Sequence, residues 1–384
     1  MKQPIRVLIV LGSSGLGGAE NMVINYYLAM DRKKVQCDFL FHVKAKGSRD
    51  QLIRSCGGKV FYVPTIKPKN YFKYKRSLKE FFKKNRYHIV HSHINAYGYW
   101  ALKEARKNNA SVRIAHSHTS IEPFFKKIFL KNIQWSSTFK ELIQDLLKHL
   151  LRKQATHYFA CGHKAGKWLF GEKNSNKVTI IQNAIDSSLF IYDSEQSKEV
   201  KKKFPLGKKV IGHVGNFTEA KNHRFLVHVF RKMLNENPNL VLALVGEGNL
   251  QNEIEDEVLK LEMEDKVFFL GLRGDVNQLL IGFDLFLFPS LYEGLPVSLI
   301  EAQASGLKIL ASENITKEVA ITDLIEFLNL NHGEEVWAKT ALDSLEYQRR
   351  NMSNEIKTAG YDILENAKML QKFYIDNYMT YVRN

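Results

Sequence analysis

Two carboxylates, Glu293 and Glu301, border a turn whose backbone could bind an anion. The stretch 284–306 reads as a short apolar strand, a loop and a helix that starts at Pro296 and ends before Gly306. Proline is tolerated at the first position of a helix, and glycine is favoured just past its end. The start of such a helix presents free N–H groups and the positive end of a dipole. An anion site beside two carboxylates suits a ligand with both phosphates and hydroxyls, such as a nucleotide sugar.

The spacing of the two glutamates, with seven residues between them, resembles the E-x7-E motif of retaining glycosyltransferases with the GT-B fold, the group 1 or GT4 class. The surrounding PSLYEGLPVSLIEAQASGL is most similar to the branch that builds bacterial capsular and exopolysaccharides. The resemblance implies that Glu301 binds the donor ribose, that Glu293 lies near the donor sugar, and that Gly294 and Leu295 contact the donor. The alternative is a core helix with two solvated glutamates.

A second loop, GNFTEAKN at 215–222, follows an expected strand. Members of the family usually carry Gly-Arg-x-x-x-x-Lys here, with both cations on the donor diphosphate. This chain keeps Lys221 but has Asn216 in place of the arginine. Asn216 could still donate a hydrogen bond, and Arg273 or Arg224 could supply charge. The resemblance therefore assigns Lys221, Asn216 and Arg273 to the donor, with reduced activity or an altered donor geometry as the consequence of Asn216.

The glycine-rich turn GSSGLGG at 12–18 follows the first apolar strand and precedes a helix. It is neither the G-x-G-x-x-G dinucleotide fingerprint nor a P-loop, because it lacks the P-loop lysine. In the family, Gly-Gly-Ala-Glu, here residues 17–20, faces the donor across the cleft. The resemblance thus assigns Gly17 and Gly18 to the donor. A tight turn that needs small residues would explain the same glycines.

Histidines end two expected strands, at 88–93 and 113–119. His118 matches the position where the family places a histidine near the reacting sugar, and His93 and His116 are its candidate neighbours. Residues i and i+2 of a strand share a face, so each His-x-His pair could chelate a metal. No Cys or carboxylate cluster accompanies them, and we predict no metal site. Hydrogen-bonded histidines at strand ends are the alternative to a functional role.

The chemistry implied by the resemblance is retaining transfer of a sugar from a nucleoside diphosphate sugar. The protein would mainly stabilise the charge of the leaving diphosphate. His118, Glu293 and Lys221 are the candidate catalytic residues. No Asp-x-Asp occurs in the chain, so the metal clamp of the other major transferase fold is not encoded. We therefore expect metal-independent activity with no cofactor, and no protein nucleophile if the donor phosphate takes the acceptor proton.

Charge is distributed unevenly along the chain. The net charge is +16; residues 1–185 hold 34 Lys and Arg against 10 Asp and Glu, and the rest hold 22 against 30. A basic half suggests an anionic partner, namely a phospholipid, a lipid diphosphate or nucleic acid. The segment 121–135, IEPFFKKIFLKNIQW, mixes phenylalanines and lysines as membrane-interface segments do. An ordinary surface helix with one apolar face explains it equally well.

The same observations suggest where the protein works. The first apolar run is short and leads into the glycine-rich turn, so no signal peptide is expected. No run reaches the ~18–20 apolar residues of a membrane span. Three scattered cysteines are typical of a reducing cytoplasm. We expect a cytoplasmic protein, peripheral on the inner face of the plasma membrane, with a lipid-linked or oligosaccharide acceptor.

Alternating strands and helices predict an α/β protein of the GT-B type, with two doubly wound Rossmann-like domains and a cleft between them. The expected domains are residues 1–185 on the acceptor side and 186–366 on the nucleotide-sugar side. A helix at about 367–384 is expected to return to the first domain, and 340–364 reads as one further helix.

Two other functions fit parts of the pattern. Another GT-B enzyme, such as a nucleotide-sugar epimerase or a phosphorylase, could use the same donor motif, and an epimerase would release an altered sugar without an acceptor. A basic nucleic-acid-binding protein would explain the charge of residues 1–185, and would show steep salt dependence. No DNA- or RNA-binding signature accompanies that charge, so nucleic acid is not an expected partner.

Overall fold

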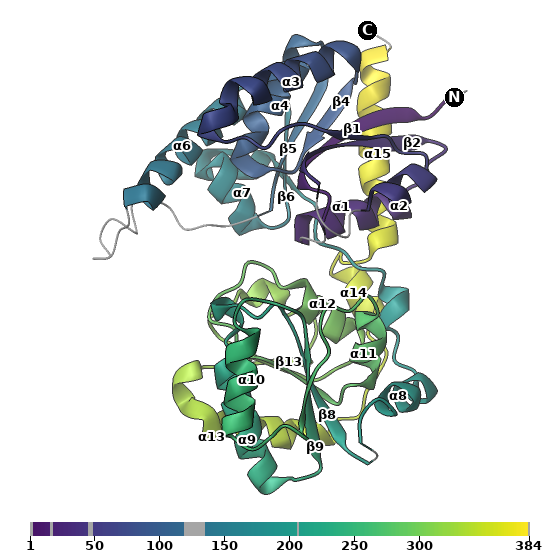
Figure 1. Ribbon diagram of the computed structural model, residues 1–384. Helices are drawn as coiled ribbons and strands as arrows, with labels where there is room; N and C mark the ends of the chain where they lie inside the picture. Colours follow the sequence, from purple (N-terminus) through teal and green to yellow (C-terminus); the bar gives the residue numbers. More distant parts are fainter. Residues whose placement is uncertain (1–2, 16–17, 45–48, 119–134, 206, 383–384) are drawn as a thin grey trace. The chain divides into compact units, whose positions relative to one another are not determined.

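The computed structural model describes residues 3–15, 18–44, 49–118, 135–205 and 207–382. The chain divides into two compact units (Figure 1). Unit 1 comprises Met1–Ala184 and Ile363–Asn384, and unit 2 comprises Ile185–Asp362. The last helix of the chain therefore belongs to the first unit. The sequence analysis had placed the boundary after residue 185 and the start of the returning helix at about 367.

Unit 1 is built on a seven-stranded parallel sheet with the order β3-β2-β1-β4-β5-β6-β7. The strands are β1 (Ile5–Ser13), β2 (Val35–Val43), β3 (Val60–Tyr62), β4 (Ile89–Ser92), β5 (Val112–Ser117), β6 (His157–Ala160) and β7 (Val178–Ile180). One face carries α1 (Gly18–Ala29), α2 (Asp50–Ser55) and α15 (Ile363–Val382). The other carries α3 (Tyr71–Lys84), α4 (Tyr99–Lys107), α6 (Trp135–Arg152) and α7 (His163–Phe170).

The first strand shows why this sheet is buried on both faces. Val7 and Ile9 pack with α1 and α15, whereas Leu8 and Val10 pack with α3 and α4. A strand covered by helices on both sides must be apolar at nearly every position rather than at alternate positions. The continuous apolar runs in the sequence follow from this arrangement.

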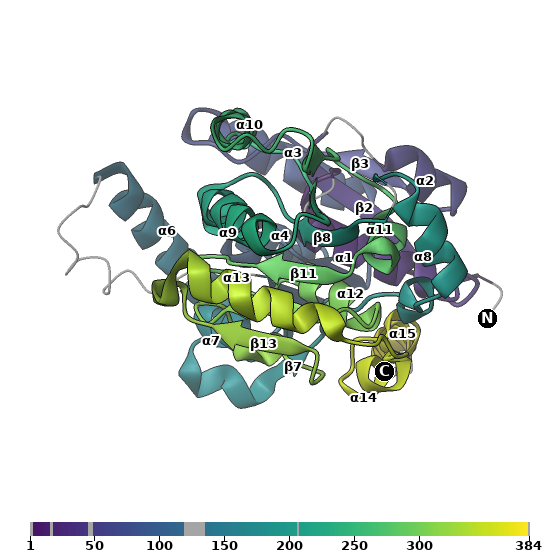
Figure 2. The ribbon, with the colours of Figure 1, turned by 90° about the horizontal axis from the view of Figure 1, so that it is seen from below.

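Unit 2 repeats the design with six parallel strands in the order β10-β9-β8-β11-β12-β13. They are β8 (Lys209–Val214), β9 (Leu240–Val245), β10 (Val267–Phe269), β11 (Leu285–Phe288), β12 (Ile309–Ser312) and β13 (Ile325–Leu328). One face carries α9 (His223–Glu236), α10 (Gln251–Lys260) and α13 (Gly333–Asp343) (Figure 2). The other carries α8 (Ser194–Lys201), α11 (Val276–Gly282), α12 (Val297–Ala304) and α14 (Ser353–Thr358). The prediction of two doubly wound α/β domains is confirmed.

Each sheet has one point at which the strand order reverses. In unit 1 it lies between β1 and β4, and in unit 2 between β8 and β11. Ligands of open α/β sheets bind outside the carboxyl ends of the strands at such a point. The loops that leave these four strands are therefore the places where a site is expected.

One predicted helix is wrong. Residues 340–364 do not form a single helix, because α13 ends at Asp343 and α14 starts only at Ser353. Between them, Arg349 donates hydrogen bonds to the carbonyls of Leu280 and Ile281 at the end of α11, 3.1 and 2.8 Å away. The last carbonyls of a helix have no partner within it. Arg349 thus ties this stretch to the end of α11, and Gly360, with φ of +79°, is incompatible with a helix that continues through it.

The described residues contain no helix that is both long and apolar enough to cross a membrane.

Candidate active site

An ion pair between Lys221 and Glu293 lies at the reversal point of unit 2. Lys221 ends the short helical turn Glu219–Lys221 after β8, and Glu293 lies in the loop after β11. Lys221 Nζ is 2.8 Å from Glu293 Oε1, and the two side chains are only 15% and 18% exposed. Lys221 Nζ also lies 4.5 Å from the centre of the Phe288 ring. The sheet thus brings together a cation and a carboxylate from distant parts of the chain.

Hydrogen bonds to backbone carbonyls hold these two loops against each other. Asn222 adopts a left-handed conformation with φ of 55°, and its Nδ2 donates to the carbonyl of Pro289 at 3.1 Å. The N–H of Leu291 donates to the carbonyl of Ala220 at 2.8 Å. Asparagine tolerates this conformation better than most residues. These loop contacts hold Lys221 in place in addition to its ion pair with Glu293.

Gly215 leaves the space that Lys221 occupies. A Cβ at position 215 would lie 2.9 Å from Lys221 Cδ, 2.9 Å from Lys221 Cε and 2.9 Å from His213 Nε2. Contacts under 3.0 Å require something to shift. A side chain at position 215 would therefore displace the Lys221 stem or the His213 ring.

Helix α12 carries the second glutamate. It starts at Val297 after Pro296, and Gly306 follows its end with φ of +68°. The predicted helix is confirmed to within one residue. Glu301 lies in the second turn, where it is partly buried, and this desolvation raises the pKa of its carboxyl to about 7. Such a raised pKa means that the ionised carboxylate has too few nearby cations or hydrogen-bond donors to offset the loss of water around it.

The turn between the loop and α12 is open on one side. Gly294 is exposed, and no atom lies within 4 Å of the place where its Cβ would be. Leu295 packs partly into the core on the α11–α12 face. Lys221, Glu293, Gly294, Leu295 and Glu301, all predicted from the sequence, thus belong to one end of the unit 2 sheet.

The cations proposed to replace the family arginine are engaged elsewhere. Asn216 is exposed in the loop after β8. Arg273 forms a bidentate ion pair with Asp275 at 2.8 and 2.7 Å, which lowers the pKa of Asp275 to about 2. Arg224 lies 3.8 Å from Glu257. Both arginines are thus paired with carboxylates in this structure, and their contribution to the donor site stays a prediction.

Two histidines behind the Lys221 loop were missed by the sequence analysis. His213 on β8 and His223 at the start of α9 are buried, with ring centres 4.8 Å apart. His213 Nδ1–H donates to the carbonyl of Leu287 at 2.8 Å, and Nε2 of both rings has no partner among the described residues. Burial lowers the pKa of His223 to about 4 and that of His213 well below its usual value. The signal available in the sequence was His213, a histidine within an otherwise largely apolar strand.

In unit 1, four histidines form a ladder at the ends of β4 and β5. His91 Nε2 is 3.1 Å from His116 Nδ1, and His93 Nδ1 is 2.9 Å from His118 Nε2. At the far end of the ladder, His91 Nδ1 shares a hydrogen bond with the hydroxyl of Tyr374 on α15, at 2.7 Å. Burial lowers the pKa of all four imidazoles, to about 4 for His118. The ladder therefore consists of neutral rings at neutral pH.

The ladder has part of the character of a metal site. Ring nitrogens of His91, His93 and His116 lie within 4.8 Å of one another. However, both nitrogens of His91 already take part in hydrogen bonds, and its ring stacks on His93 with centres 4.1 Å apart. Zinc ligands instead converge on one point at about 2.0–2.1 Å. Hydrogen bonds engage at least one nitrogen of each ring, although His116 Nε2 has no partner among the described residues, and the absence of a metal stays a prediction.

The remaining predicted residues are in unit 1. His118 is anchored by its backbone N–H, which donates to Asn95 Oδ1 at 2.9 Å. Gly18 is the exposed first residue of α1, with open space where a Cβ would be. Gly17 lies outside the described residues, as does nearly all of the predicted interface segment 121–135. Gly18 and His118 thus follow β1 and β5, next to the reversal point of unit 1.

Comparison with known proteins matches both halves of the chain to glycosyltransferases. Residues 16–189 match the family described as Glycosyltransferase Family 4, and residues 194–357 match Glycosyl transferases group 1. Among solved structures, Anabaena Alr3699/HepE in complex with UDP-glucose is similar, with a TM-score of 0.68, 17% identity, and coverage of 96% of this chain and 94% of that one. This structural likeness concerns the fold.

Relatives in sequence extend over most of the chain. The putative glycosyltransferase EpsF of Bacillus subtilis (strain 168) is 36% identical over 381 residues, or 96% of each chain. The capsular polysaccharide biosynthesis glycosyltransferase CapH of Staphylococcus aureus is 26% identical and covers 97% of this chain and 99% of its own. The UDP-Gal:alpha-D-GlcNAc-diphosphoundecaprenol alpha-1,3-galactosyltransferase of Escherichia coli is 24% identical over 78% of each. With its two parallel-sheet units and these matches along nearly its whole length, the chain belongs to the group 1, or family 4, glycosyltransferases of the GT-B fold.

Proposed function

We propose that this glycosyltransferase moves a sugar, with retention, from a nucleoside diphosphate sugar to a lipid-linked saccharide in bacterial surface polysaccharide synthesis. The observation that carries the proposal is the Lys221–Glu293 pair at the reversal point, next to the start of α12 and Glu301. The names of the relatives support the finer points. CapH is a capsular polysaccharide enzyme, and the E. coli relative uses UDP-Gal and a diphosphoundecaprenol-linked acceptor.

The charge of the leaving diphosphate is the main demand of this reaction. Lys221 Nζ and the free N–H groups at the start of α12 can meet it without a metal ion or cofactor. In the structure Lys221 is paired with Glu293, so the diphosphate exchanges one anionic partner of the lysine for another. Glu293 is then free to accept a hydrogen bond from the sugar. Glu301 binds the ribose hydroxyls as a carboxylate.

The covalent step needs no protein nucleophile. The bond between the anomeric carbon and the diphosphate oxygen breaks, and the acceptor hydroxyl oxygen bonds to the same face of that carbon. The acceptor proton passes to the phosphate oxygen that leaves. We assign His118 to contact with the sugar, and Gly17, Gly18 and Asn216 to the donor. Arg273 would have to leave Asp275 in order to contribute.

The function is tested with a panel of nucleotide sugars, measured for saturable binding and for slow hydrolysis. A polyprenyl diphosphate saccharide is then added, and the configuration of the new linkage is read by NMR. Transfer with inversion would refute retention. Conversion of the nucleotide sugar to an isomer without any acceptor would instead identify an epimerase.

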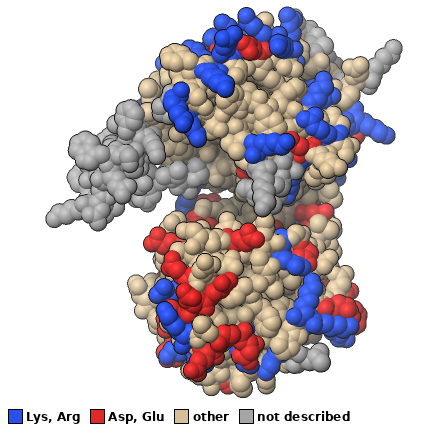
Figure 3. Space-filling view, viewed as in Figure 1, with Lys and Arg blue, Asp and Glu red and all other residues tan. Residues whose placement is uncertain are grey.

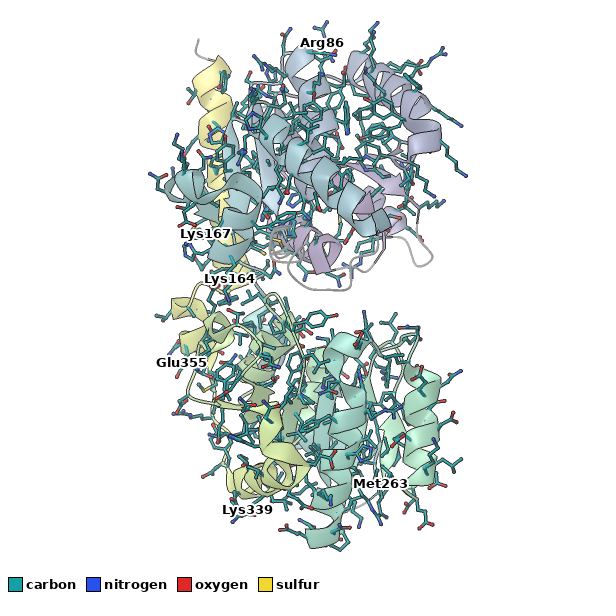
Figure 4. The ribbon with its side chains drawn as sticks, turned by 90° about the vertical axis from the view of Figure 1, so that its left-hand side faces the viewer. Arg86, Lys164, Lys167, Met263, Lys339 and Glu355 are labelled. Atoms are coloured by element: carbon teal, nitrogen blue, oxygen red, sulfur yellow. The ribbon has the colours of Figure 1, made fainter. Side chains whose placement is uncertain are left out.

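We also propose that unit 1 binds the anionic inner surface of the plasma membrane. On α3, six cationic side chains are exposed and the one acidic residue, Glu80, is paired with Arg76. The six are Lys73, Lys75, Arg76, Lys79, Lys83 and Lys84. Phe72 on the same helix is 83% exposed. Figure 3 shows Lys and Arg gathered on unit 1 and many carboxylates on unit 2. Arg86, labelled in Figure 4, follows the end of α3 in the sequence.

Co-sedimentation with vesicles of varied anionic lipid content tests this membrane contact. Each basic residue near such a surface contributes about 1 kcal/mol, so Lys75→Gln with Lys79→Gln should weaken binding about 30-fold at low salt. The matched control replaces Lys164 and Lys167, exposed on α7 (Figure 4), and should have a smaller effect. Equal binding to neutral and anionic vesicles would contradict the electrostatic account.

A further inference from the structure

The side chain of Asn95 holds the backbone of His118. We propose that Asn95 is a positioning residue that sets the place of His118 in the site. The proposal deepens the proposed function and rests on it, because it requires contact between His118 and the donor sugar. Asn95 acts only through His118 and is assigned no contact with the substrate.

The ladder of hydrogen bonds between β4 and β5 ends before it reaches His118. The last residue pair of these strands is Ser92 with Ala115, and β5 ends at Ser117. The N–H of His118, the next residue, donates to Asn95 Oδ1 at 2.9 Å. Asn95 starts the short helical turn Asn95–Gly98 that follows β4. Its side-chain carbonyl therefore extends the link between the two strands by the residue that the site uses.

The backbone of Asn95 is unusual for a residue with a side chain. Its φ of 48° lies in the left-handed region, and three other described residues besides glycines share a positive φ. Two of these, Asn109 and Glu262, follow the ends of α4 and α10, where a left-handed residue commonly closes a helix. Asn95 precedes α4 instead, so helix closure does not explain it. Strained backbone of this kind is concentrated at functional sites.

The third residue, Asn222, offers a parallel within the same chain. It follows β8 at the reversal point of unit 2, and its side chain bonds to the backbone of the loop after the neighbouring strand β11. Asn95 follows β4 at the reversal point of unit 1, and its side chain bonds to the backbone just after the neighbouring strand β5. Each left-handed asparagine thus holds the segment of a candidate catalytic residue, Lys221 in unit 2 and His118 in unit 1.

The other contacts of His118 restrain its ring rather than its backbone. His118 Nε2 lies 2.9 Å from His93 Nδ1, and the ring stacks on His116 with centres 4.3 Å apart. The described residues offer the backbone N–H of His118 no acceptor other than Asn95. Loss of that acceptor should therefore shift His118 relative to the sugar while the fold persists.

The test removes the bond without changing the backbone preference of position 95. Asn95→Gly lacks the acceptor, but glycine adopts a positive φ readily. Asn95→Asp keeps an acceptor oxygen. The matched control is Asn109→Gly, the same change at an exposed left-handed asparagine with no side-chain hydrogen bond among the described residues.

The bond itself is read from the exchange rate of the His118 amide hydrogen, measured by NMR in the full chain. We expect exchange to be about 2–10-fold faster in Asn95→Gly, as for a lost hydrogen bond. Exchange should stay close to the wild-type rate in Asn95→Asp and in Asn109→Gly. An unchanged rate in Asn95→Gly would overturn the proposal.

Kinetics tests whether the bond acts through His118. The release of UDP from a mixture of UDP-glucose and UDP-galactose is measured for Asn95→Gly, His118→Ala and the double variant. We expect Asn95→Gly to lower kcat about 2–10-fold with little change in KM, and Asn95→Asp to recover most of this loss. The double variant should be no slower than His118→Ala, because residues that act as one unit are not additive.

An equal loss from Asn95→Gly in the His118→Ala background would overturn the proposal. If His118→Ala alone releases UDP at the wild-type rate while the amide exchange of His118 responds to Asn95→Gly, the hold of Asn95 is supported and the sugar contact of His118 fails.

Discussion

The partly buried carboxyl of Glu301 should make donor binding depend on pH, if Glu301 binds the donor ribose as we propose. Its pKa is about 7 in the structure, because burial disfavours the ionised form. A carboxylate that accepts hydrogen bonds from two ribose hydroxyls is stabilised in its ionised form, so donor binding should lower this pKa. Below the pKa of the free protein, binding must first remove a proton, and affinity falls as the pH falls.

The size of the effect follows from the fraction ionised. With a pKa of about 7, about 3% of Glu301 is ionised at pH 5.5 and nearly all at pH 8.5. The apparent affinity for a UDP-sugar should therefore be about 30-fold weaker at pH 5.5. Glu301→Gln cannot ionise, so its affinity should be weaker by about 10–100-fold at pH 8.5 and nearly independent of pH.

Stability should change in the opposite sense. Glu301 has a pKa of about 7 in the fold against an ordinary 4.5, so its ionisation costs up to about 3 kcal/mol of folding free energy. This cost is absent below pH 4.5, grows up to pH 7 and is constant above it. Glu301→Gln should remove it, and should raise the melting temperature at pH 8 while lowering donor affinity.

Isothermal titration calorimetry at several pH values, in buffers of different ionisation enthalpy, measures both the affinity and the protons released. We expect release of about half a proton at pH 7 in the wild type and none in Glu301→Gln. A wild-type affinity that is constant between pH 5.5 and 8.5 would refute the reasoning. So would a variant that unfolds, because that result would favour a purely structural role for Glu301.

Three further predictions concern charge. Lys221→Ala should lower turnover by about 10²–10³-fold, as the removal of one preorganised donor does, and this loss should exceed that caused by Asn216→Ala. Asn216→Arg should raise turnover. Steady-state kinetics measures all three variants. Activity should persist in a chelator, and loss that magnesium or manganese restores would contradict the metal-free account. Acid should destabilise unit 2 through His213 and His223. Below pH 6.5 these histidines are protonated in the unfolded chain but stay neutral in the fold, because burial lowers their pKa. The free energy of unfolding should therefore fall by about 1.4 kcal/mol for each histidine with every pH unit below 6.5. For His223 this decrease should end at about pH 4, where the folded form also takes up its proton. Denaturant unfolding between pH 7 and 4 measures this slope, and a flat profile would contradict burial of these rings.

Local sequence determined much of the fold. Apolar runs predicted the parallel strands because both faces of each sheet are covered, and Pro296 and Gly306 marked the ends of α12 because their backbone preferences act locally. The predicted helix over 340–364 failed, and the stretch between α13 and α14 is instead tied by Arg349 to the end of a helix more than 60 residues away. No local pattern reports such a contact.

The site was predictable in its residue types but not in its pairings. The motif identified Lys221 and Glu293, yet their contact depends on β8 and β11 being neighbours in the sheet. The bond between His91 and Tyr374 spans 283 positions and likewise follows only from the topology. The donor roles assigned to the individual residues stay predictions until the kinetics are measured.

The return of α15 to unit 1 has a consequence for how the protein is made. On a ribosome, residues 185–362 of unit 2 are synthesised between the two segments of unit 1. At about 5–20 residues per second, this takes on the order of 10–35 seconds. During that time the groove that receives Leu370 and Tyr374, beside Met22 and Tyr26, has no helix over it. Unit 1, although begun earlier, cannot cover this apolar surface until its last 22 residues have been made.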